Sequence, residues 1–252
     1  MSGIKKARAS AFIHLRSVGR WSALALLVLL QACATVANPD RRDPMEALNR
    51  NIFGFNDAVD TVVLKPVATV YREVTPSWVR LGVGNFFNNL DDVWSAVNNV
   101  LQGRPKYAGE SMGRVVVNTT VGLLGVVDVA SNLELERRPA NFGLTLGRWG
   151  MKPGPYVVLP LLGPSTLRDV AALPIDMQGN LVNHVQEEAV RTLLTGLNVV
   201  STRSNLLQAS NMADGAALDK YSFFRDAYFQ RQRNRFYDGN PPEDEEARPP
   251  AK

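Results

Sequence analysis

One cysteine stands where its thiol can become a lipid anchor. Cys33 is the only cysteine among 252 residues, and it ends the run Leu30-Gln31-Ala32-Cys33. Leucine, any residue, a small residue and then cysteine form the pattern on which bacterial lipoprotein processing acts. A lone cysteine cannot form an intramolecular disulfide, and a free thiol is a liability in an oxidising periplasm. We therefore predict that Cys33 carries a thioether-linked diacylglycerol and an N-acyl chain. The alternative is a buried free cysteine beside a plain cleavage site.

The residues before Cys33 are typical of a lipoprotein signal peptide, which we predict over 1–32. Basic residues extend to Arg20, and an apolar run follows from Trp21 to Leu30. This run is too short for a stable membrane-crossing helix, which needs about 20 residues. Position 34 is alanine, whereas an aspartate there commonly marks retention in the inner membrane. Because two or more acyl chains anchor a protein stably, we predict a lipoprotein held on the periplasmic side of the outer membrane of a Gram-negative bacterium.

Other residues that could perform catalysis are scarce. His184 is the only histidine after the predicted signal peptide, and a zinc site needs three or four ligands of the histidine and cysteine types. A Ser-His-Asp triad would have to use His184, but no G-x-S-x-G sequence surrounds a serine, and no phosphate-binding loop is present. The adjacent carboxylates Asp91 and Asp92 would point in different directions on a helix. We therefore predict that the protein is not an enzyme, and that it has neither a metal site nor a cofactor beyond its acyl chains.

The net charge of +4 belongs to the N-terminus. Residues 1–32 contain five of the 28 basic residues and none of the 24 acidic ones, so 23 basic and 24 acidic residues remain. A nucleic-acid-binding protein needs a basic patch in its folded part. The only candidates are Arg225, Arg231, Arg233 and Arg235. We interpret them as the solvated face of a helix, and we predict no nucleic-acid partner.

Apolar residues recur at helical spacing through most of the remaining chain. From Met45 to Val59 they follow at intervals of three, four, three and four residues, which gives a helix one apolar face. We predict Asp43 as its N-cap and Pro44 as its first helical residue, and Pro66 predicts a break or kink in its continuation. Alternating patterns are rare, so we predict a mostly α fold. Further helices are predicted from Pro76, over about 91–102, over 165–201 and over about 214–237.

Composition divides the chain into four parts. We assign residues 1–32 to the signal peptide, 33–42 to a polar tether, 43–238 to a single helical domain and 239–252 to a tail. The tail is rich in proline and acidic residues, and we predict that it is disordered.

Two apolar stretches do not fit an ordinary helix. Residues 112–130 are the most apolar part of the mature chain, but glycine and polar residues interrupt them. We predict a helix or re-entrant segment that is buried in protein or lies shallow in lipid. Residues 150–165 contain four prolines, which break helices and donate no hydrogen bond to a sheet. We predict an irregular or hairpin-like element there, the alternative being an ordinary loop over a soluble core.

Five segments occur in an order that resembles one known family. They are DPMEALNRNIFGFNDAVDTVVLKPVATVYREVTP at 43–76, VGNFFNNLDDVWSAVNNVLQG at 83–103, VVVNTTVGLLGVVDVAS at 115–131, FGLTLGRWGMKPGPYVVLPLLGPSTLRD at 142–169 and RDAYFQRQ at 225–232. Together with the lipidation signal, they resemble the MlaA family of outer-membrane lipoproteins across residues 43–238.

The resemblance implies a function in lipid transport. Family members remove mislocalised phospholipids from the outer leaflet of the outer membrane and pass them to a periplasmic carrier, MlaC, so that lipid asymmetry is maintained. The implied fold is a ring of amphipathic helices embedded in one membrane leaflet, with an amphipathic channel through it. The implied partners are phospholipids, a trimeric outer-membrane porin and MlaC.

The resemblance also implies residues that restrain the channel or touch lipid. Phe53, Phe55 and Asn56 lie in the family region that restrains the channel, and Arg191 lies where the family has a cationic residue near the channel mouth. The alternative for Arg191 is an exposed helix arginine. The further predicted lipid contacts are Gly122, Leu123, Leu124, Val126, Val127 and Tyr156.

Two other classes of function remain open. One is a porin-associated structural or adaptor lipoprotein without a lipid conduit. The other is a membrane-bound phospholipid hydrolase that uses His184, which the missing nucleophile and base disfavour.

Overall fold

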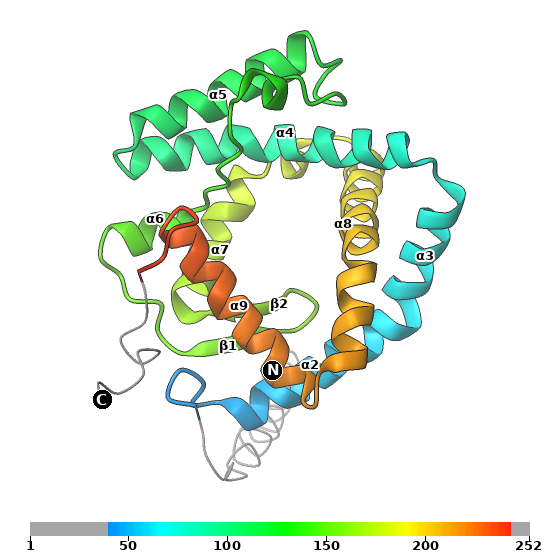
Figure 1. Cartoon of the computed structure of the whole chain (residues 1–252), viewed down its shortest axis with the longest axis vertical. Coiled ribbons are helices and arrows are strands. Elements are labelled where there is room, and N and C mark those ends of the chain that lie inside the picture. The colour runs from blue at the N-terminus through cyan, green and yellow to red at the C-terminus, as the bar shows by residue number, and fades with distance from the viewer. Residues whose placement is uncertain (1–39, 243–252) are drawn as a thin grey trace, which may run out of the picture.

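The apolar periodicity of the sequence gives rise to helices over most of the chain. The structure is a computed structural model, and it describes residues 40–242. These residues form a ring of helices around a central opening, with a two-stranded sheet on one side (Figure 1). The elements, in chain order, are α2 (Glu46–Val59), η1 (Asp60–Leu64), α3 (Lys65–Val74), α4 (Ser77–Leu101), α5 (Pro105–Thr120), η2 (Ala130–Leu133), α6 (Phe142–Arg148), β1 (Tyr156–Leu159), β2 (Gly163–Thr166), α7 (Leu167–Gly179), η3 (Leu181–His184), α8 (Glu188–Ala216) and α9 (Lys220–Phe236).

The first arc of the ring passes a proline and stays helical. α2 continues into the π-helix η1 and then into α3, which has Pro66 in its first turn. A proline inside an α-helix lacks an N–H donor and collides with a carbonyl group of the preceding turn. A π-helical turn is a known cause of helix kinks, and its changed hydrogen bonding lets the backbone avoid such a collision. The break or kink expected at Pro66 is therefore a π-helical turn over Asp60–Leu64.

The second arc is a helical hairpin of α4 and α5. Neither residue 90 nor residue 91 is a proline or glycine that would end a helix. The helix expected over 91–102 is therefore the second half of the longer α4. α4 ends at Leu101, and Gly103 follows with a φ of 68°. Glycine adopts this left-handed conformation easily, and Pro105 then begins α5.

A buried ion cluster joins α5 to α4 and to the segment that follows α5. Arg114 of α5 is 2% exposed. Its Nε lies 3.1 Å from Asp92 of α4, and its Nη2 lies 3.0 Å from Asp128 in the segment after α5. Asp92 also accepts a hydrogen bond of 2.9 Å from Arg137 Nε. Removing one member of such a cluster leaves a buried charge unpaired, so the cluster fixes the position of α5 on α4.

The Gly/Pro-rich stretch forms the predicted hairpin. β1 pairs antiparallel with β2, with Tyr156 opposite Thr166 and Leu159 opposite Gly163. Leu161 and Gly163 have positive φ angles of 63° and 80°, which reverse the chain. Both strands are edge strands, where proline is tolerated because a missing N–H breaks no ladder. The hydrophobic core under the hairpin contains Tyr156, Val158 and Tyr221.

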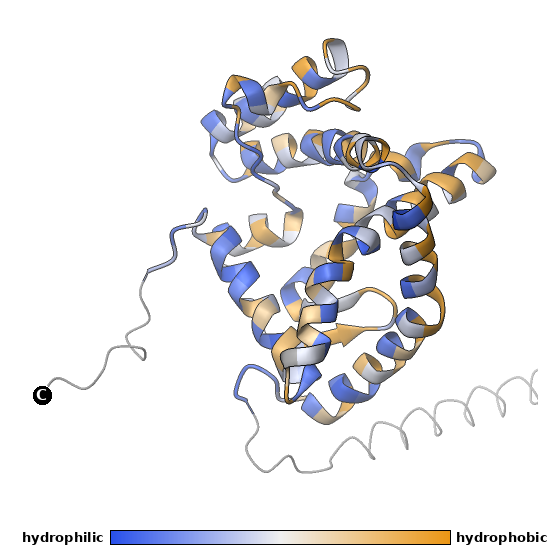
Figure 2. Cartoon of the chain, turned by 45° about the vertical axis from the view of Figure 1, so that its right-hand side comes forward, coloured by the Kyte–Doolittle hydropathy of each residue, from blue (hydrophilic) through white to orange (hydrophobic). Residues whose placement is uncertain are grey.

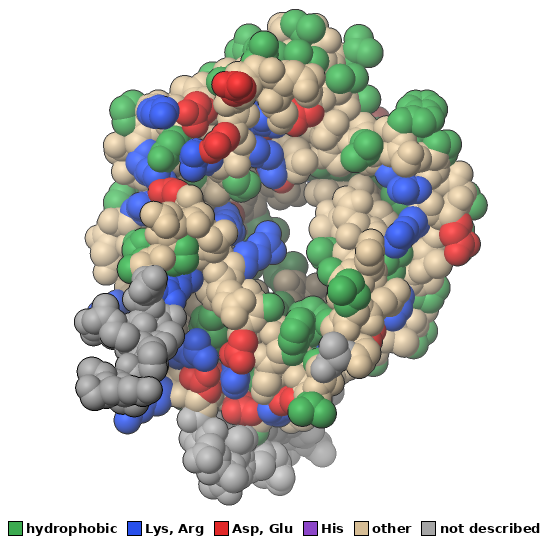
Figure 3. Space-filling model, in the orientation of Figure 1, with side chains coloured by type: hydrophobic (Ala, Val, Ile, Leu, Met, Phe, Trp, Pro, Cys, Tyr) green, Lys and Arg blue, Asp and Glu red, His purple; other side chains and the backbone are tan. Residues whose placement is uncertain are grey.

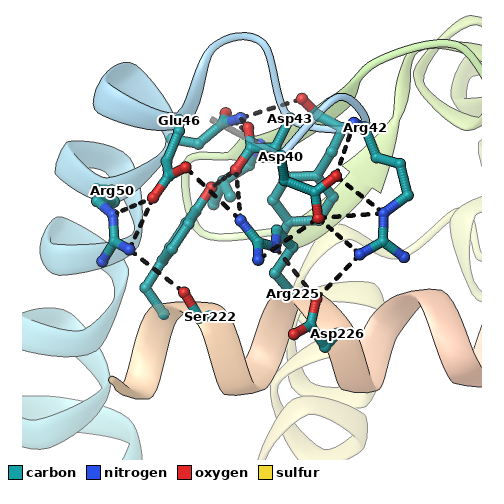
Figure 4. Close-up of polar contacts among 12 residues, drawn as sticks. Asp40, Arg42, Asp43, Glu46, Arg50, Ser222, Arg225 and Asp226 are labelled. Atoms are coloured by element: carbon teal, nitrogen blue, oxygen red, sulfur yellow. Dashed lines mark hydrogen bonds and ion pairs between the residues drawn. The ribbon is translucent and has the colours of Figure 1, made fainter. Parts of the chain in front are cut away.

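A polar cluster joins the start of α2 to α9 and closes the ring (Figure 4). Asp43 has no exposed area, and its carboxylate accepts hydrogen bonds from Asn49 Nδ2 at 2.7 Å and from the Tyr221 hydroxyl group. Arg225 Nη1 lies 3.6 Å from Asp43 and 3.7 Å from Glu46. Because these groups come from both ends of the described chain, no local sequence pattern predicts the cluster.

Some of the expectations for these segments are wrong. Asp43 does not cap α2, since Met45 stands at the N-cap and Tyr221 occupies the Asp43 carboxylate. Arg225 is buried rather than solvated, because it faces carboxylates from the start of α2. The last helix begins at Lys220 rather than near 214, since Asp219 accepts a hydrogen bond from the Tyr221 N–H as its cap. The helical region over 165–201 is interrupted by η3 and then continues to Ala216.

Parts of the predicted organisation lie outside the described residues. These are Cys33, the signal peptide and most of the tail. Two residues of the predicted tether, in contrast, contact the ring. The Arg42 carbonyl oxygen accepts a hydrogen bond of 2.8 Å from the Tyr156 N–H, and Asp40 lies 3.6 Å from Arg225.

Large apolar side chains are exposed around the ring, and Figure 2 shows hydrophobic residues along many of its helices. Trp78 of α4 is 74% exposed, as is Val62 of η1. Other examples are Val70, Val74, Leu81, Val116 and Leu193. Within residues 40–242, no helix has both the length and the apolar character that crossing a membrane requires.

Candidate functional site

The ring surrounds an opening that side chains leave unfilled (Figure 3). A cavity of about 750 Å³ lies inside the ring, and α4, α7, α8 and α9 all contribute to its wall. α4 contributes Trp94 and Asp91, α7 contributes Asp176, and α8 contributes Thr202. Because α8 lies across the opening from α7 and α9 (Figure 1), the cavity extends across the interior of the ring.

A second cavity, of about 420 Å³, lies between α2, α8 and α9. Its wall includes the apolar side chains of Phe53, Leu206 and Phe224. The Nε and Nη2 atoms of Arg203 in this wall donate to the two carboxylate oxygens of Asp60, at 2.6 and 2.8 Å. Hydrogen bonding to Asp60 raises the pKa of Arg203, so the guanidinium group stays charged. Sequence reasoning missed Arg203, because its partner lies 143 residues away and no local motif links the two.

The predicted channel-restraining residues of α2 face different surroundings. Phe53 packs against Tyr221 and Phe224 of α9, with ring centroids 5.6 and 5.8 Å apart, and it lines the second cavity. Phe55 is 53% exposed. Asn56 also lines the second cavity. The structure thus brings Phe53 and Asn56 to one cavity and leaves Phe55 at the surface.

Two asparagines of α2 bind β1 and the following turn as a neighbouring strand would. Asn49 Nδ2 donates to the Tyr156 carbonyl oxygen at 3.0 Å, and the Val158 N–H donates to Asn49 Oδ1 at 2.9 Å. Two helical turns later, Asn56 Nδ2 donates to the Leu159 carbonyl oxygen at 2.9 Å, and the Leu161 N–H donates to Asn56 Oδ1 at 2.7 Å. A single helix face therefore fixes the backbone of the hairpin and its turn.

Tyr156 supports this hairpin and is closed off from lipid in this arrangement. Its side chain has no exposed area, and its ring lies 5.7 Å from that of Tyr228 and 5.4 Å from that of Phe229. Burial raises the pKa of its phenol above the ordinary value, and the nearby Asp43 adds to the effect. The prediction that Tyr156 contacts lipid is corrected, because the aromatic core encloses the side chain.

The other predicted lipid contacts form a tight turn after α5. They are Gly122, Leu123, Leu124, Val126 and Val127. Leu123 and Leu124 have positive φ angles of 53° and 59°, and their side chains are 71% and 69% exposed. The Val127 N–H donates to the Gly122 carbonyl oxygen at 2.8 Å. A Cβ atom at Gly122 would lie 2.1 Å from the Val127 oxygen, so only glycine fits there. The turn presents two leucines outward, and their contact with lipid stays a prediction.

Arg191 lies in the first turn of α8. Its Nη1 donates to the Val185 carbonyl oxygen at 3.2 Å, and it lines neither of the cavities described above. Its role near a channel mouth stays a prediction. The same holds for the absence of a metal site, although no group of three or more histidine, cysteine or acidic residues among residues 40–242 is placed to hold a metal ion.

Comparison with known proteins gives one consistent result. Residues 41–235 match the family described as MlaA lipoprotein. The intermembrane phospholipid transport system lipoproteins MlaA of Shigella flexneri and of Escherichia coli K12 are each 36% identical over 219 residues, covering 84% of this chain and 86% of the relative. The protein of the same name from Haemophilus influenzae is 30% identical over 237 residues, covering 90% of this chain and 94% of the relative.

The fold is also shared with a solved structure. That structure is described as the structural basis for maintenance of bacterial outer membrane lipid asymmetry. It superposes with a TM-score of 0.68 at 34% identity, and the match covers 79% of this chain and 100% of the other.

Proposed function

Because this chain belongs to the MlaA lipoprotein family, we propose that it works in phospholipid transport at the outer membrane. It removes mislocalised phospholipids from the outer leaflet through the opening of the ring and passes them to a periplasmic carrier, MlaC. Lipid asymmetry of the outer membrane is thereby maintained. No bond of the lipid is made or broken, so the protein acts as a transporter component and not as an enzyme.

The observation that carries the proposal is an open cavity inside a ring with an apolar exterior. The cavity of about 750 Å³ has Asp91, Asp176 and Thr202 in its wall, whereas Trp78 and Val62 are exposed. A ring lying in one leaflet needs apolar side chains against acyl chains and polar groups where a headgroup passes. The hairpin and the turn after α5 also fit this setting, since non-helical backbone at membrane depth must be buried in protein or line a wet cavity.

Anchoring and partners complete the proposal. Acyl chains on Cys33 hold the protein on the periplasmic side of the outer membrane, where two or more chains give a stable attachment. In this proposal the ring lies beside a trimeric porin and in contact with the inner leaflet, and its exposed apolar side chains support this location. Lipid that has passed the ring is then accessible to the soluble carrier.

Filling the opening tests this function. Thr202 is exposed and lines the cavity, so Thr202→Trp places an indole in the opening without disturbing the core. In cells that lack the native protein, we expect this variant to leave phospholipid in the outer leaflet and to leave the cells sensitive to detergent. The matched control is Gln208→Trp, at an exposed position of the same helix that does not line the cavity.

Photo-crosslinking from the cavity supplies an independent readout. We expect a photoreactive residue at position 173 or 202 to capture phospholipid, and one at Lys106, whose side chain is 82% exposed, to capture little. If Thr202→Trp restored lipid asymmetry as well as the unaltered chain while porin binding persisted, the opening would not be a conduit. The protein would then be an adaptor.

A further inference from the structure

Two arginines of α9 face the larger cavity, and no acidic side chain among residues 40–242 forms an ion pair with either of them. Arg231 and Arg235 are four residues apart, so they share one face of the helix, and both line the cavity. Figure 3 shows basic side chains at the opening on the side where α9 lies. Arg231 is exposed and has no hydrogen bond or ion pair within residues 40–242. The contact of Arg235 in that range is a weak hydrogen bond to the Pro139 carbonyl oxygen at 3.4 Å, and its Nε is buried without a partner.

The acidic groups of the same cavity are already engaged. Asp176 accepts hydrogen bonds from Trp94 Nε1 at 2.8 Å and from the Phe142 N–H at 2.7 Å. Asp91 lies 3.8 Å from Arg137. Burial raises the pKa of Asp91, and the positive charge of Arg137 opposes this rise. Neither carboxylate is hydrogen-bonded to an arginine of α9. The charges of Asp169 and Asp176 act on Arg235 from a distance and partly oppose the lowering of its pKa.

The two guanidinium groups also disturb each other. Burial lowers the pKa of Arg235, and the positive charge of Arg231 lowers it further. An anion between the two groups would relieve their repulsion and would supply an acceptor for the buried Nε of Arg235. Guanidinium groups match phosphate particularly well, because their parallel N–H donors reach two of its oxygens at once.

We propose that Arg231 and Arg235 form a binding site for a phosphate group inside the opening of the ring. The phosphate belongs to the headgroup of a phospholipid, which the two arginines hold while its acyl chains remain outside the polar wall. The identity of this source rests on the proposed function, whereas the anion site rests on the geometry of the cavity alone.

The site can be tested by titration calorimetry on the full acylated chain in a nonionic detergent. One arm uses inorganic phosphate as the probe, and the other uses dihexanoylphosphatidylglycerol below its micelle concentration. The variants are Arg231→Gln, Arg235→Gln and the double substitution. Arg233→Gln is the matched control, since Arg233 lies on the same helix but lines a different cavity, together with Phe229 and Phe236. Thermal melting of each variant checks that it is folded.

We expect the double variant to bind the lipid probe roughly tenfold or more weakly, because charge-assisted hydrogen bonds are lost, and Arg233→Gln to bind as the unaltered chain does. Loss of affinity in both arms supports the site with a lipid headgroup as its natural ligand. Loss in the phosphate arm, with no lipid binding by any protein, supports the anion site but assigns it to free phosphate. Equal affinity of the double variant and Arg233→Gln would overturn the proposal, as would the absence of binding by the unaltered chain in both arms.

Failure of the arginine site can be distinguished from failure of the proposed transport function. A double variant that binds the lipid probe normally while Thr202→Trp still abolishes lipid asymmetry would overturn the arginine site and leave transport intact. If Thr202→Trp restored asymmetry and the double variant lost phosphate affinity, the transport function would fail and the anion site would stand.

Discussion

The Oδ1 atom of Asn56 accepts a hydrogen bond of 2.7 Å from the backbone N–H of Leu161, 105 residues further along the chain. The same side chain donates to the Leu159 carbonyl oxygen at 2.9 Å. The turn of the hairpin is thus held by a helix that also lines the second cavity through Phe53 and Asn56. This relationship connects two segments that the sequence analysis treated separately, residues 53–56 of α2 and the Gly/Pro-rich stretch over 150–165.

Asn56→Ala should release the turn of the hairpin. Two hydrogen bonds are lost while the helix keeps its backbone, so we expect amide hydrogen exchange at Leu161 to accelerate by roughly tenfold or more. Asn51→Ala is the control, because Asn51 is exposed on the same helix. Unchanged exchange at Leu161 would mean that the two hydrogen bonds do not hold the turn. In cells, we expect Asn56→Ala to change outer-leaflet phospholipid levels, as measured by lipid labelling.

Gly54→Ala should stabilise α2. No atom lies within 4 Å of the position that a Cβ atom at Gly54 would occupy, and the residue is inside the helix. Alanine in a helix interior is more stable than glycine by about 0.5–1 kcal/mol, which urea unfolding in detergent can measure. The contrasting variant is Gly179→Ala, which we expect to destabilise, because its Cβ atom would lie 2.1 Å from the Trp94 ring. A stability loss at Gly54→Ala would contradict the open surroundings of this position.

Asp43→Ala should weaken the closure of the ring. The fully buried carboxylate accepts hydrogen bonds from Asn49 and Tyr221 and lies 3.6 Å from Arg225, so its removal deprives the Tyr221 hydroxyl group of its acceptor and Arg225 of one of its carboxylates. We expect a loss of about 3–5 kcal/mol in the free energy of unfolding. Asp226→Ala is the control in the same cluster (Figure 4), since its side chain is 48% exposed and an exposed ion pair contributes at most about 1 kcal/mol. Equal losses for the two variants would rule out a special role for the buried carboxylate.

Acid should weaken the attachment of the segment after α5. Burial alone would raise the pKa of Asp128, but hydrogen bonds from Ser131, Arg114 and Asn118 outweigh burial and lower it to about 2. A carboxylate with a lowered folded-state pKa stabilises the fold above its unfolded pKa of about 4, and this contribution is lost as the pH falls toward 2. We therefore expect Asp128→Asn to be less stable than the unaltered chain at pH 6, and the difference to shrink between pH 4 and pH 2. A difference that is independent of pH would show that the Asp128 charge contributes nothing.

The double variant Leu123→Asp with Leu124→Asp should bind membranes more weakly. Both side chains are highly exposed at a turn, so the change removes apolar surface without opening a core. We expect reduced flotation with phospholipid vesicles of protein that carries Cys33→Ala, together with an unchanged melting temperature. Leu218→Asp is the control, because this fully exposed leucine lies between α8 and α9, away from the turn. Equal loss of flotation in the control would refute a specific role for the turn.

Local patterns in the sequence predicted much of the fold. The apolar spacing from Met45 to Val59 predicted α2, the helix expected over about 91–102 ends with α4 at Leu101, and the prolines of 150–165 predicted an irregular or hairpin-like element that is a hairpin. Each of these signals depends on restricted backbone angles or on the spacing of apolar residues along one helix face. Both are determined by residues that are close together in the chain. The family resemblance was recognisable for the same reason, since its five motifs are contiguous.

The candidate site was much harder to predict from the sequence than the fold. Tyr156 was expected to touch lipid and is buried against aromatic rings of α9. Arg231 and Arg235 were interpreted as part of a solvated helix face; Arg231 is exposed and Arg235 is half-buried, and the sequence did not indicate that both line the cavity. Whether an aromatic ring is buried, or an arginine faces a cavity, depends on residues far away in the chain.

Local residue patterns were enough to predict most of the helices, an irregular or hairpin-like element over 150–165, the family and the single cysteine suited to lipidation, because each depends on residues that are close together in the chain. Three features became visible only in the folded protein: the ring closes through Asp43 and Tyr221, Asn56 holds the hairpin, and two arginines of α9 face the opening without an ion pair to any acidic residue in 40–242. These are relations between groups separated by as many as 178 residues. Such pairs are fixed by the packing of whole helices, which no local pattern encodes.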